Sequence, residues 1–223
     1  MHSPSSSLRV RRWRTPQDYT SIYLQMREFT QMRTSATPDE LWFLEHSPVF
    51  TQGPRSEPEH LLDIGDIPLV VTNRGGQVTY HGPGQLVVYV LVDITRLGWN
   101  VRQLVQQLQN SLVALLHTYG ITGHTDIDKP GVYVGTGNAK IASLGLRIHK
   151  GCSYHGLSLN IDLDLEPFSR ITPCGVANQK MAKITDFKAL TVETVAQHYI
   201  QTLPIILGHS PTSITLTEEE AIA

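Results

Sequence analysis

A glycine-rich segment that leads directly into an apolar strand is the feature that most constrains the fold of this chain. Residues 74–85 read RGGQVTYHGPGQ and contain four glycines and one proline. Glycine permits positive φ angles and close approach of the backbone to a ligand, so such a loop can aim N–H groups at an anion or a carbonyl oxygen. A pair of tight turns is the more ordinary use of these residues. The segment lacks the lysine and hydroxyl ending of a Walker phosphate loop and the spacing of a dinucleotide fingerprint.

In the rest of the chain, predicted strands outnumber predicted helices. Runs rich in Val, Ile, Leu, Tyr and Ser predict strands at 41–51, 69–71, 85–94, 131–134, 140–148 and 153–163. Apolar residues at helical spacing predict helices that begin near Thr15 and near Asn100, and a third from Thr191 to Leu203, closed by Pro204. Because the two kinds of element do not alternate regularly, we expect an α+β fold with mixed or antiparallel sheets packed against helices.

Length and composition predict one folded domain between two loose ends. The chain has 223 residues, of which 40% are hydrophobic and 17% charged, so it is not a disordered chain. We expect a flexible basic N-terminus at 1–14, a single domain at 15–208 and a loose polar tail at 209–223. The net charge of -2 does not favour nucleic acid as a partner. The chain shows no signal peptide and no apolar run that could span a bilayer, so we expect a cytoplasmic protein without a membrane partner.

The glycine-rich segment resembles the signature of the lipoyl(octanoyl) transferases, also called octanoyl-acyl carrier protein:protein N-octanoyltransferases. The pattern RGGxxTxHxxGQ, followed by a tyrosine at position 89, is met at every fixed position. Three further regions agree in order: 45–53, 140–147, and 151–160 with 172–175. The resemblance covers residues 15–190 and implies a fold similar to the catalytic domain of biotin and lipoate protein ligases.

The resemblance implies that Cys174 is an acyl-thioester nucleophile and that Lys140 is its acid/base partner. A free cysteine titrates near pH 8.5, so a nearby cation is needed to raise the thiolate fraction at neutral pH. Lys140 stands in an apolar strand-like run, where a lysine is out of place unless it faces a site. Taken alone, a single cysteine is more often a small buried apolar residue. Cys152 is the rival nucleophile, and the family pattern gives it a structural role.

The resemblance also implies an acyl-binding slot walled by small or apolar residues. Its expected lining is Arg74, Gly75, Gly76, Gln77, Val78, Thr79, Tyr80, His81, Ser143, Leu144, Gly145, Gly156, Leu157 and Ser158. For His155, a catalytic role and a structural role are equally open. Backbone N–H groups near Gly145 or Gly75–Gly76 are candidates for an oxyanion hole. No metal is expected, because the histidines show no HExxH or paired-cysteine spacing.

The activity implied by the resemblance is transfer of an octanoyl group from octanoyl-acyl carrier protein to the lysine of lipoyl domains, through a thioester on Cys174. The donor group is carried on the phosphopantetheine of the carrier protein, and no ATP, metal or redox cofactor is expected. The expected acceptors are the lipoyl domains of 2-oxoacid dehydrogenase complexes and the glycine cleavage H protein, with the enzyme acting as a monomer. Three alternatives stay open: an ATP-dependent lipoate ligase, a non-catalytic module that binds acyl carrier or lipoyl domains, and a cysteine hydrolase that releases octanoate.

Overall fold

The computed structural model describes residues 7–176 and 179–220, and the side chain of Cys174 lies outside the described part. The helices are α1 (Tyr19–Met32), α2 (Val101–Thr118) and α3 (Val192–Ile206). The strands are β1 (Leu8–Trp13), β2 (Asp39–Leu44), β3 (Val49–Gln52), β4 (Leu69–Val71), β5 (Thr79–His81), β6 (Gln85–Leu91), β7 (Gly123–Thr125), β8 (Gly131–Val134), β9 (Ala139–His149), β10 (Cys152–Asn160) and β11 (Ile214–Glu219). A single 3-10 turn, Pro173–Gly175, contains the backbone of Cys174.

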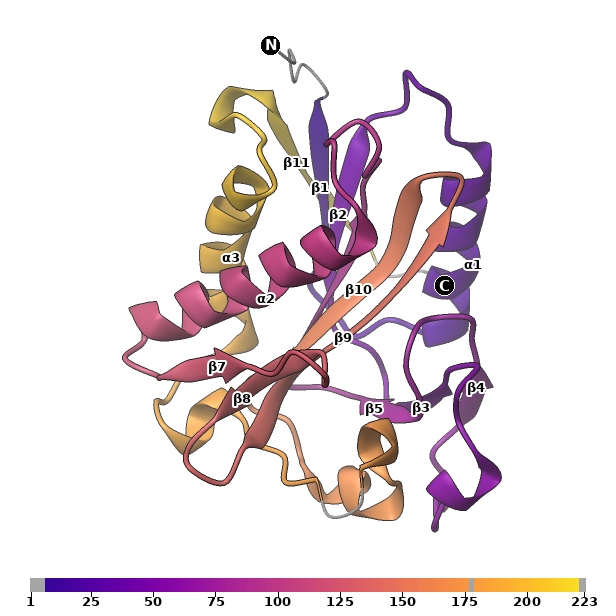
Figure 1. Ribbon diagram of the computed structural model, residues 1–223, viewed down its shortest axis with the longest axis vertical. Coiled ribbons are helices and arrows are strands. Elements are labelled where there is room, and N and C mark those ends of the chain that lie inside the picture. Colours follow the sequence, from indigo (N-terminus) through magenta and orange to yellow (C-terminus); the bar gives the residue numbers. More distant parts are fainter. Residues whose placement is uncertain (1–6, 177–178, 221–223) are drawn as a thin grey trace.

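The described strands form a mixed eight-stranded sheet in the order β11-β1-β2-β6-β10-β9-β8-β7 and a three-stranded sheet in the order β4-β3-β5 (Figure 1). Strand β1 runs parallel to both of its neighbours, β11 and β2. From β2 onward, the neighbouring strands of the large sheet are antiparallel. The helices do not alternate with parallel strands, so the predicted α+β class with mixed sheets is confirmed.

The large sheet is covered by α2 and α3 on one face and by α1 on the other. Leu41 and Phe43 of β2 pack in the cluster that contains α2 and α3 residues, whereas Trp42 and Leu44 pack with α1. Strand β6 alternates in the same way, and all of its residues are buried. A strand covered on both faces needs apolar residues at consecutive positions, which is why 86–91 reads as a continuous apolar run.

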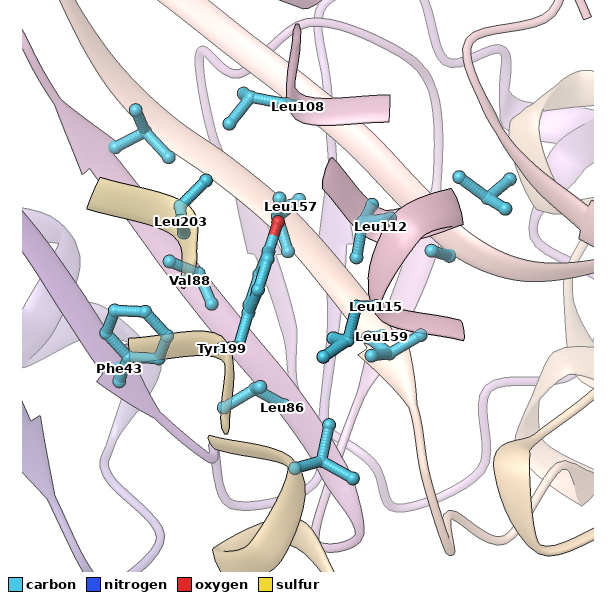
Figure 2. Close-up of a cluster of buried hydrophobic side chains, with 14 of the residues drawn as sticks. Phe43, Leu86, Val88, Leu108, Leu112, Leu115, Leu157, Leu159, Tyr199 and Leu203 are labelled. Atoms are coloured by element: carbon cyan, nitrogen blue, oxygen red, sulfur yellow. The ribbon is translucent and has the colours of Figure 1, made fainter. Parts of the chain in front are cut away.

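The larger core fills the space between the sheet, α2 and α3 (Figure 2). Tyr199 of α3 lies across the middle of this cluster, and its hydroxyl group hydrogen-bonds the hydroxyl of Ser111 on α2 at 2.6 Å. Burial of the phenol raises the pKa of Tyr199. The leucines around it come from α2 and β10: Leu108, Leu112, Leu115, Leu157 and Leu159.

Helix α2 begins where the sequence predicts, but the other two helices each differ at one end. The predicted cap at Thr15 is wrong, because Asp18 caps α1 and accepts a hydrogen bond from the Ser21 N–H at 2.8 Å. The predicted stop at Pro204 is also wrong, because α3 continues through it to Ile206. A proline in the last turn of a helix removes one backbone hydrogen bond but need not end the helix. None of the described helices is both long and apolar enough to cross a membrane.

Five of the predicted strands are confirmed, one predicted strand is wrong, and several described strands were not predicted. Strands β4 and β8 have the predicted bounds, while β6, β9 and β10 differ by one to three residues at their ends. The predicted strand at 41–51 is instead two strands, β2 and β3, which belong to different sheets. Strands β5 and β7 contain three residues each, too few for a period of two to be visible in the sequence.

The predictions of a flexible N-terminus and a loose tail are wrong for residues 8–13 and 214–219. Leu8 and Val10 are fully buried, and β1 lies between β11 and β2 inside the large sheet. Its arginines are paired with acids from distant parts of the chain; Arg9, for example, lies 3.1 Å from Glu40. The folded unit therefore extends beyond the predicted limits at 15 and 208.

Candidate active site

One cavity gathers the residues expected to bind the acyl chain. All of the expected lining residues except Tyr80 surround it, from the 74–81 segment and from the facing parts of β9 and β10. The space free of atoms, open mouth and its solvent included, is about 490 Å³. We call it the acyl cavity. The substrate-binding role of its residues stays a prediction.

Tyr80 does not line the acyl cavity. Successive side chains of a strand point to opposite faces, so Thr79 and His81 face the cavity while Tyr80 between them faces away. Its ring packs against Phe50 at 5.5 Å and against Phe168 at 5.7 Å, measured between ring centroids. The prediction that Tyr80 lines this cavity is therefore wrong, and its place is in a separate apolar cluster behind β5.

Three glycines allow the backbone to close around the acyl cavity. A Cβ atom on Gly145 would lie 2.6 Å from the carbonyl oxygen of Gly75, and one on Gly156 would lie 2.0 Å from that of Val88. The Gly75 N–H also donates a hydrogen bond to the carbonyl of Leu146 at 3.1 Å. The glycine-rich segment therefore packs backbone to backbone on β9, which no larger residue would permit. Because that N–H is already bonded, Gly75 is not a free oxyanion donor, and this part of the prediction is wrong.

Arg74 is a buried cation that ties the glycine-rich segment to β3. Its guanidinium donates to the hydroxyl of Thr51 at 2.8 and 3.0 Å and to the Thr51 carbonyl at 2.6 Å. A further N–H donates to the carbonyl of Gly75 at 3.1 Å. The planar fork of arginine suits this use, since several donors are held in fixed directions at once.

Hydrogen bonds fix the tautomer of His81. The side-chain amide nitrogen of Gln85 donates to the oxygen of Asn160 at 2.9 Å and to the Tyr80 carbonyl at 3.2 Å. The oxygen of Gln85 therefore faces His81 Nδ1 at 2.7 Å and can only accept, so Nδ1 carries the proton. Burial, assisted by His46 nearby, lowers the pKa of His81 to about 3. His81 is thus a neutral ring at physiological pH.

Four further residues line the acyl cavity although the sequence did not predict them there: Tyr19, Val87, Tyr89 and His155. Tyr89 belongs to the family pattern, so a signal for it was present. Its hydroxyl donates to His46 Nε2 at 2.7 Å, because His46 Nδ1 donates to the carbonyl of Gln17 at 3.0 Å. Burial lowers the pKa of His46 to about 4, so this ring is neutral as well.

His155 occupies a strained position in the middle of β10. Its φ angle is +58°, a left-handed conformation that costs a residue with a side chain about 1–2 kcal/mol. Strand alternation would place its ring with Leu157 on the α2 and α3 face. Instead, the ring stacks on Tyr154 at 5.0 Å and on Tyr23 of α1 at 5.4 Å. Burial, with Arg74 as the next cause, lowers the pKa of His155 well below its usual value.

Lys140 lies in a second cavity that adjoins the first. The two cavities share the wall formed by Gly75, Gly76, Gln77, Leu144 and Gly145. The Lys140 side chain is 2% exposed; its ammonium donates to the Pro130 carbonyl at 3.3 Å and lies 5.2 Å from the centre of the Tyr133 ring. We call this second space the lysine cavity. A buried lysine that faces a cavity is a candidate for acid/base chemistry.

Gly131 makes the room that Lys140 occupies. A Cβ atom at this position would lie 2.8 Å from Cε of Lys140 and 3.2 Å from its Nζ. The backbone of Lys140 is also held, because its N–H donates to the Lys180 carbonyl and its own carbonyl accepts from the Ala182 N–H. The sequence marked Gly131 only as the first residue of a predicted strand, since its role exists only in contact with Lys140.

The turn that contains Cys174 borders the lysine cavity on its C-terminal side. Val176 lines that cavity, and a Cβ on Gly175 would collide with the side-chain amide of Gln77 in the shared wall. The catalytic assignment of Cys174 rests on a side chain outside the described part and stays a prediction. Cys152 is buried at the opposite end of the β9–β10 hairpin, where it faces His149 across the pair. The nine residues from Lys140 to His149 span about 30 Å, so Cys152 cannot be the partner of Lys140.

Comparison with known proteins identifies the family. A sequence model described as the lipoyl protein ligase A/B catalytic domain matches residues 18–204. The octanoyltransferase of Shewanella loihica is 53% identical over 194 residues, which cover 86% of this chain and 88% of that protein. The octanoyltransferase of Chromobacterium violaceum is 53% identical over 197 residues, which cover 88% of this chain and 93% of that protein.

Solved structures agree with this result at the level of the fold. The lipoate protein ligase of Thermoplasma acidophilum aligns with a TM-score of 0.76 at 17% identity, covering 97% of this chain and 87% of that one. The biotin protein ligase of Aquifex aeolicus aligns with a TM-score of 0.54 at 12% identity, covering 93% and 70%. The expected likeness to ligase catalytic domains is confirmed. The chain belongs to the lipoyl protein ligase A/B catalytic domain family, and its relatives at about half identity place it among the octanoyltransferases, which are acyltransferases.

Proposed function

We propose that this chain transfers an octanoyl group from octanoyl-acyl carrier protein to the lysine of lipoyl domains, the first step of endogenous protein lipoylation. The identity to octanoyltransferases over most of both chains supports the reaction class. The acyl cavity supports the substrate class, since Arg74 is its only charged lining residue among those described and glycines, aliphatic side chains and neutral rings make up most of the rest. An uncharged slot of this kind suits an alkyl chain, which has no charge or hydrogen bond to satisfy.

The proposed reaction has two steps with one covalent intermediate. The thiolate of Cys174 attacks the octanoyl thioester, a new thioester forms on Cys174, and the phosphopantetheine thiol of the carrier leaves with a proton. The amine of the acceptor lysine then attacks the acyl-enzyme, an amide forms, and the Cys174 sulfur leaves. Lys140 accepts and returns the proton in these steps, as a general acid and base.

The observation that carries this proposal is the position of Lys140. Its side chain is buried in a cavity that shares a wall with the acyl cavity, and Val176, two positions after Cys174, lines the same space. A chain that lies in the acyl cavity would thus present its carbonyl carbon near the lysine cavity. Separate spaces for the chain and for proton transfer are what acyl transfer requires.

We further propose that the reaction needs no ATP, metal or redox cofactor, because exchange between thioesters is close to balanced in energy. The acceptors would be the lipoyl domains of 2-oxoacid dehydrogenase complexes and the glycine cleavage H protein. The enzyme would act as a monomer in the cytoplasm.

An ATP-dependent ligase is the alternative that the fold favours, since lipoate-protein ligase A bound with ATP aligns with a TM-score of 0.75 at 17% identity. The decisive experiment is mass spectrometry of a lipoyl domain after incubation with octanoyl-acyl carrier protein, with and without ATP. Octanoylation at equal rates in both samples supports the transferase. Modification that needs ATP and free octanoate, and fails with the carrier-bound donor, would overturn it.

A further inference from the structure

The wall between the two cavities is where the proposed reaction needs a hydrogen-bond donor. During acyl transfer the carbonyl oxygen gains negative charge, and a donor placed at that oxygen stabilises the transition state. In the proposed reaction the alkyl chain occupies the acyl cavity and proton transfer takes place in the lysine cavity, so the carbonyl lies at the wall that they share. The donor should therefore belong to this wall.

The backbone N–H groups of two glycines in the shared wall are already used. The Gly75 N–H donates to the Leu146 carbonyl. Because the backbone groups of successive strand residues point to opposite sides, the Gly145 N–H points the other way, toward β10, where Gly145 pairs with Gly156. Of the five described residues that line both cavities, only Gln77 has a polar side chain. Its amide is therefore the side-chain donor that this wall can offer.

Two glycines hold Gln77 beside the turn that contains Cys174. The backbone carbonyl of Gln77 accepts a hydrogen bond from the Gly53 N–H at 3.4 Å. Its side-chain amide fills the space that a side chain on Gly175 would take, since a Cβ there would lie 2.5 Å from Nε2 of Gln77 and closer still to Oε1. Gly175 directly follows Cys174 and has a φ angle of +67°. The Gln77 amide thus packs against the residue next to the proposed nucleophile.

The two polar atoms of the Gln77 amide have different surroundings. Oε1 is buried and accepts no hydrogen bond from the described part of the chain. Nε2, in contrast, is not fully buried, and it donates no hydrogen bond to a described residue. The opposite orientation would bury two N–H donors in place of one acceptor, which is less favourable. Since the side chain lines both cavities, its N–H groups are open to a molecule bound there.

We propose that the side-chain amide of Gln77 donates a hydrogen bond to the carbonyl oxygen of the acyl group as the thioester reacts, and is a catalytic residue of the transfer. This inference rests on the proposed acyl transfer and adds a residue to it. When the Cys174 thiolate attacks, a carbon–sulfur bond forms and the π electrons of the carbonyl move to oxygen, where the amide N–H stabilises the charge. The electrons then return, the bond to the pantetheine sulfur breaks, and that sulfur leaves with a proton from Lys140. The same donor serves when the acceptor amine attacks the acyl-enzyme.

Gln77→Met tests this role, because methionine has a similar length but no N–H group. We expect formation of the octanoyl-enzyme, followed by rapid acid quench and mass spectrometry, to slow by about 100-fold. Affinity for a non-transferable amide analogue of octanoyl-pantetheine should fall by about tenfold at most, because a hydrogen bond to an uncharged carbonyl contributes less. Gln106→Met, at an exposed position of α2, is the matched control. An unchanged rate in Gln77→Met, or an equal loss in Gln106→Met, would overturn the role.

A second reaction of the same sulfur distinguishes a carbonyl donor from a residue that positions Cys174. Alkylation by iodoacetamide needs the thiolate but places no negative charge on a carbonyl oxygen. We expect the Cys174 peptide of Gln77→Met to be alkylated within about threefold of the parent rate. A loss of alkylation as large as the loss of acylation would show that Gln77 acts by positioning the sulfur, and would overturn the carbonyl donor.

Infrared spectroscopy separates this inference from the proposed reaction. The probe is the same amide analogue, isotope-labelled at its carbonyl carbon and bound to the parent enzyme or to Gln77→Met. A hydrogen bond from Gln77 should give the bound carbonyl a lower stretching frequency in the parent enzyme than in the variant. Equal frequencies would overturn the contact, whether or not transfer occurs. If the frequencies differ as expected but no octanoyl group reaches a lipoyl domain, the contact stands and the proposed reaction fails.

Discussion

The acyl cavity and the lysine cavity share a wall, yet they are built from opposite kinds of residue. Three histidines lie in or beside the acyl cavity, and burial lowers the pKa of each, so that only Arg74 carries charge there. The lysine cavity is lined by four charged side chains: Arg55, Asp128, Lys129 and Lys140. An alkyl chain is held best where nothing charged must be desolvated, whereas proton transfer needs a group that can change its charge. The shared wall, three of whose five residues are glycines, allows both requirements to be met in adjoining spaces.

Loss of the Lys140 ammonium is the strongest test of the proposal that one cavity binds the acyl chain and the other serves proton transfer. Lys140→Met keeps an unbranched apolar stem and removes the group that moves the proton. We expect the rate of octanoyl transfer to fall by about 10²- to 10⁴-fold, while the affinity for the octanoyl-pantetheine amide analogue changes less than threefold. Lys150→Met, at the exposed β9–β10 turn, serves as the control. A Lys140→Met enzyme that keeps a tenth of the parent rate would show that the lysine cavity does not house the acid and base.

A smaller effect is expected from Gly131→Ala, which leaves Lys140 in the chain but fills the space it occupies. The new methyl would lie 2.8 Å from Lys140 Cε and 3.0 Å from the Ala142 carbonyl, and the φ angle of +154° is unfavourable for alanine. We expect transfer to slow by about tenfold and the free energy of unfolding to fall by about 1 kcal/mol. Gly137→Ala, in the same hairpin with nothing within 4 Å, is the matched control. Equal rates for the two variants would mean that the position of Lys140 is not critical.

A further prediction concerns the neutral histidines, and its effect appears in stability rather than in rate. The unfolded chain protonates His46 and His81 near pH 6.5, whereas the folded chain does so only at about 4 and about 3. Between pH 7 and pH 5 the unfolded state therefore takes up more protons, and each histidine lowers the free energy of unfolding by about 2 kcal/mol. Urea unfolding at both pH values measures this change. Equal stability at pH 5 and pH 7 would show that these rings already bind protons in the folded protein.

Much of the large sheet could be predicted from the sequence because its strands carry their signal locally. Strand β6 reads as an apolar run, and β8 is bounded by turn residues. Strand β1 was missed because its arginines resemble a solvated end, and their partners, such as Glu40 and Glu219, are distant in the sequence. Only the folded chain brings those charges together, so no local pattern could reveal the strand.

The candidate site divides in the same way between local and non-local signals. The glycine-rich segment could be recognised in the sequence, since loops with close backbone contacts need glycine at fixed positions. Tyr80 was placed wrongly because sequence spacing does not show which face of β5 a residue occupies until the strand has a partner. The role of His155 could not be decided from the sequence, because the direction of its side chain depends on a φ angle of +58° that the residue type does not predict. Gly131 was missed because its role exists only in contact with Lys140.

The central claim is that Cys174 carries the acyl group beside the space occupied by Lys140. Octanoyl-acyl carrier protein should be mixed with the enzyme in the absence of an acceptor, quenched in acid and digested, and the peptides weighed by mass spectrometry. The account predicts one octanoyl group on the peptide that contains Cys174, the same adduct in Cys152→Ala, and none in Cys174→Ala. An adduct that persists in Cys174→Ala, or that lies on the Cys152 peptide, would contradict the account.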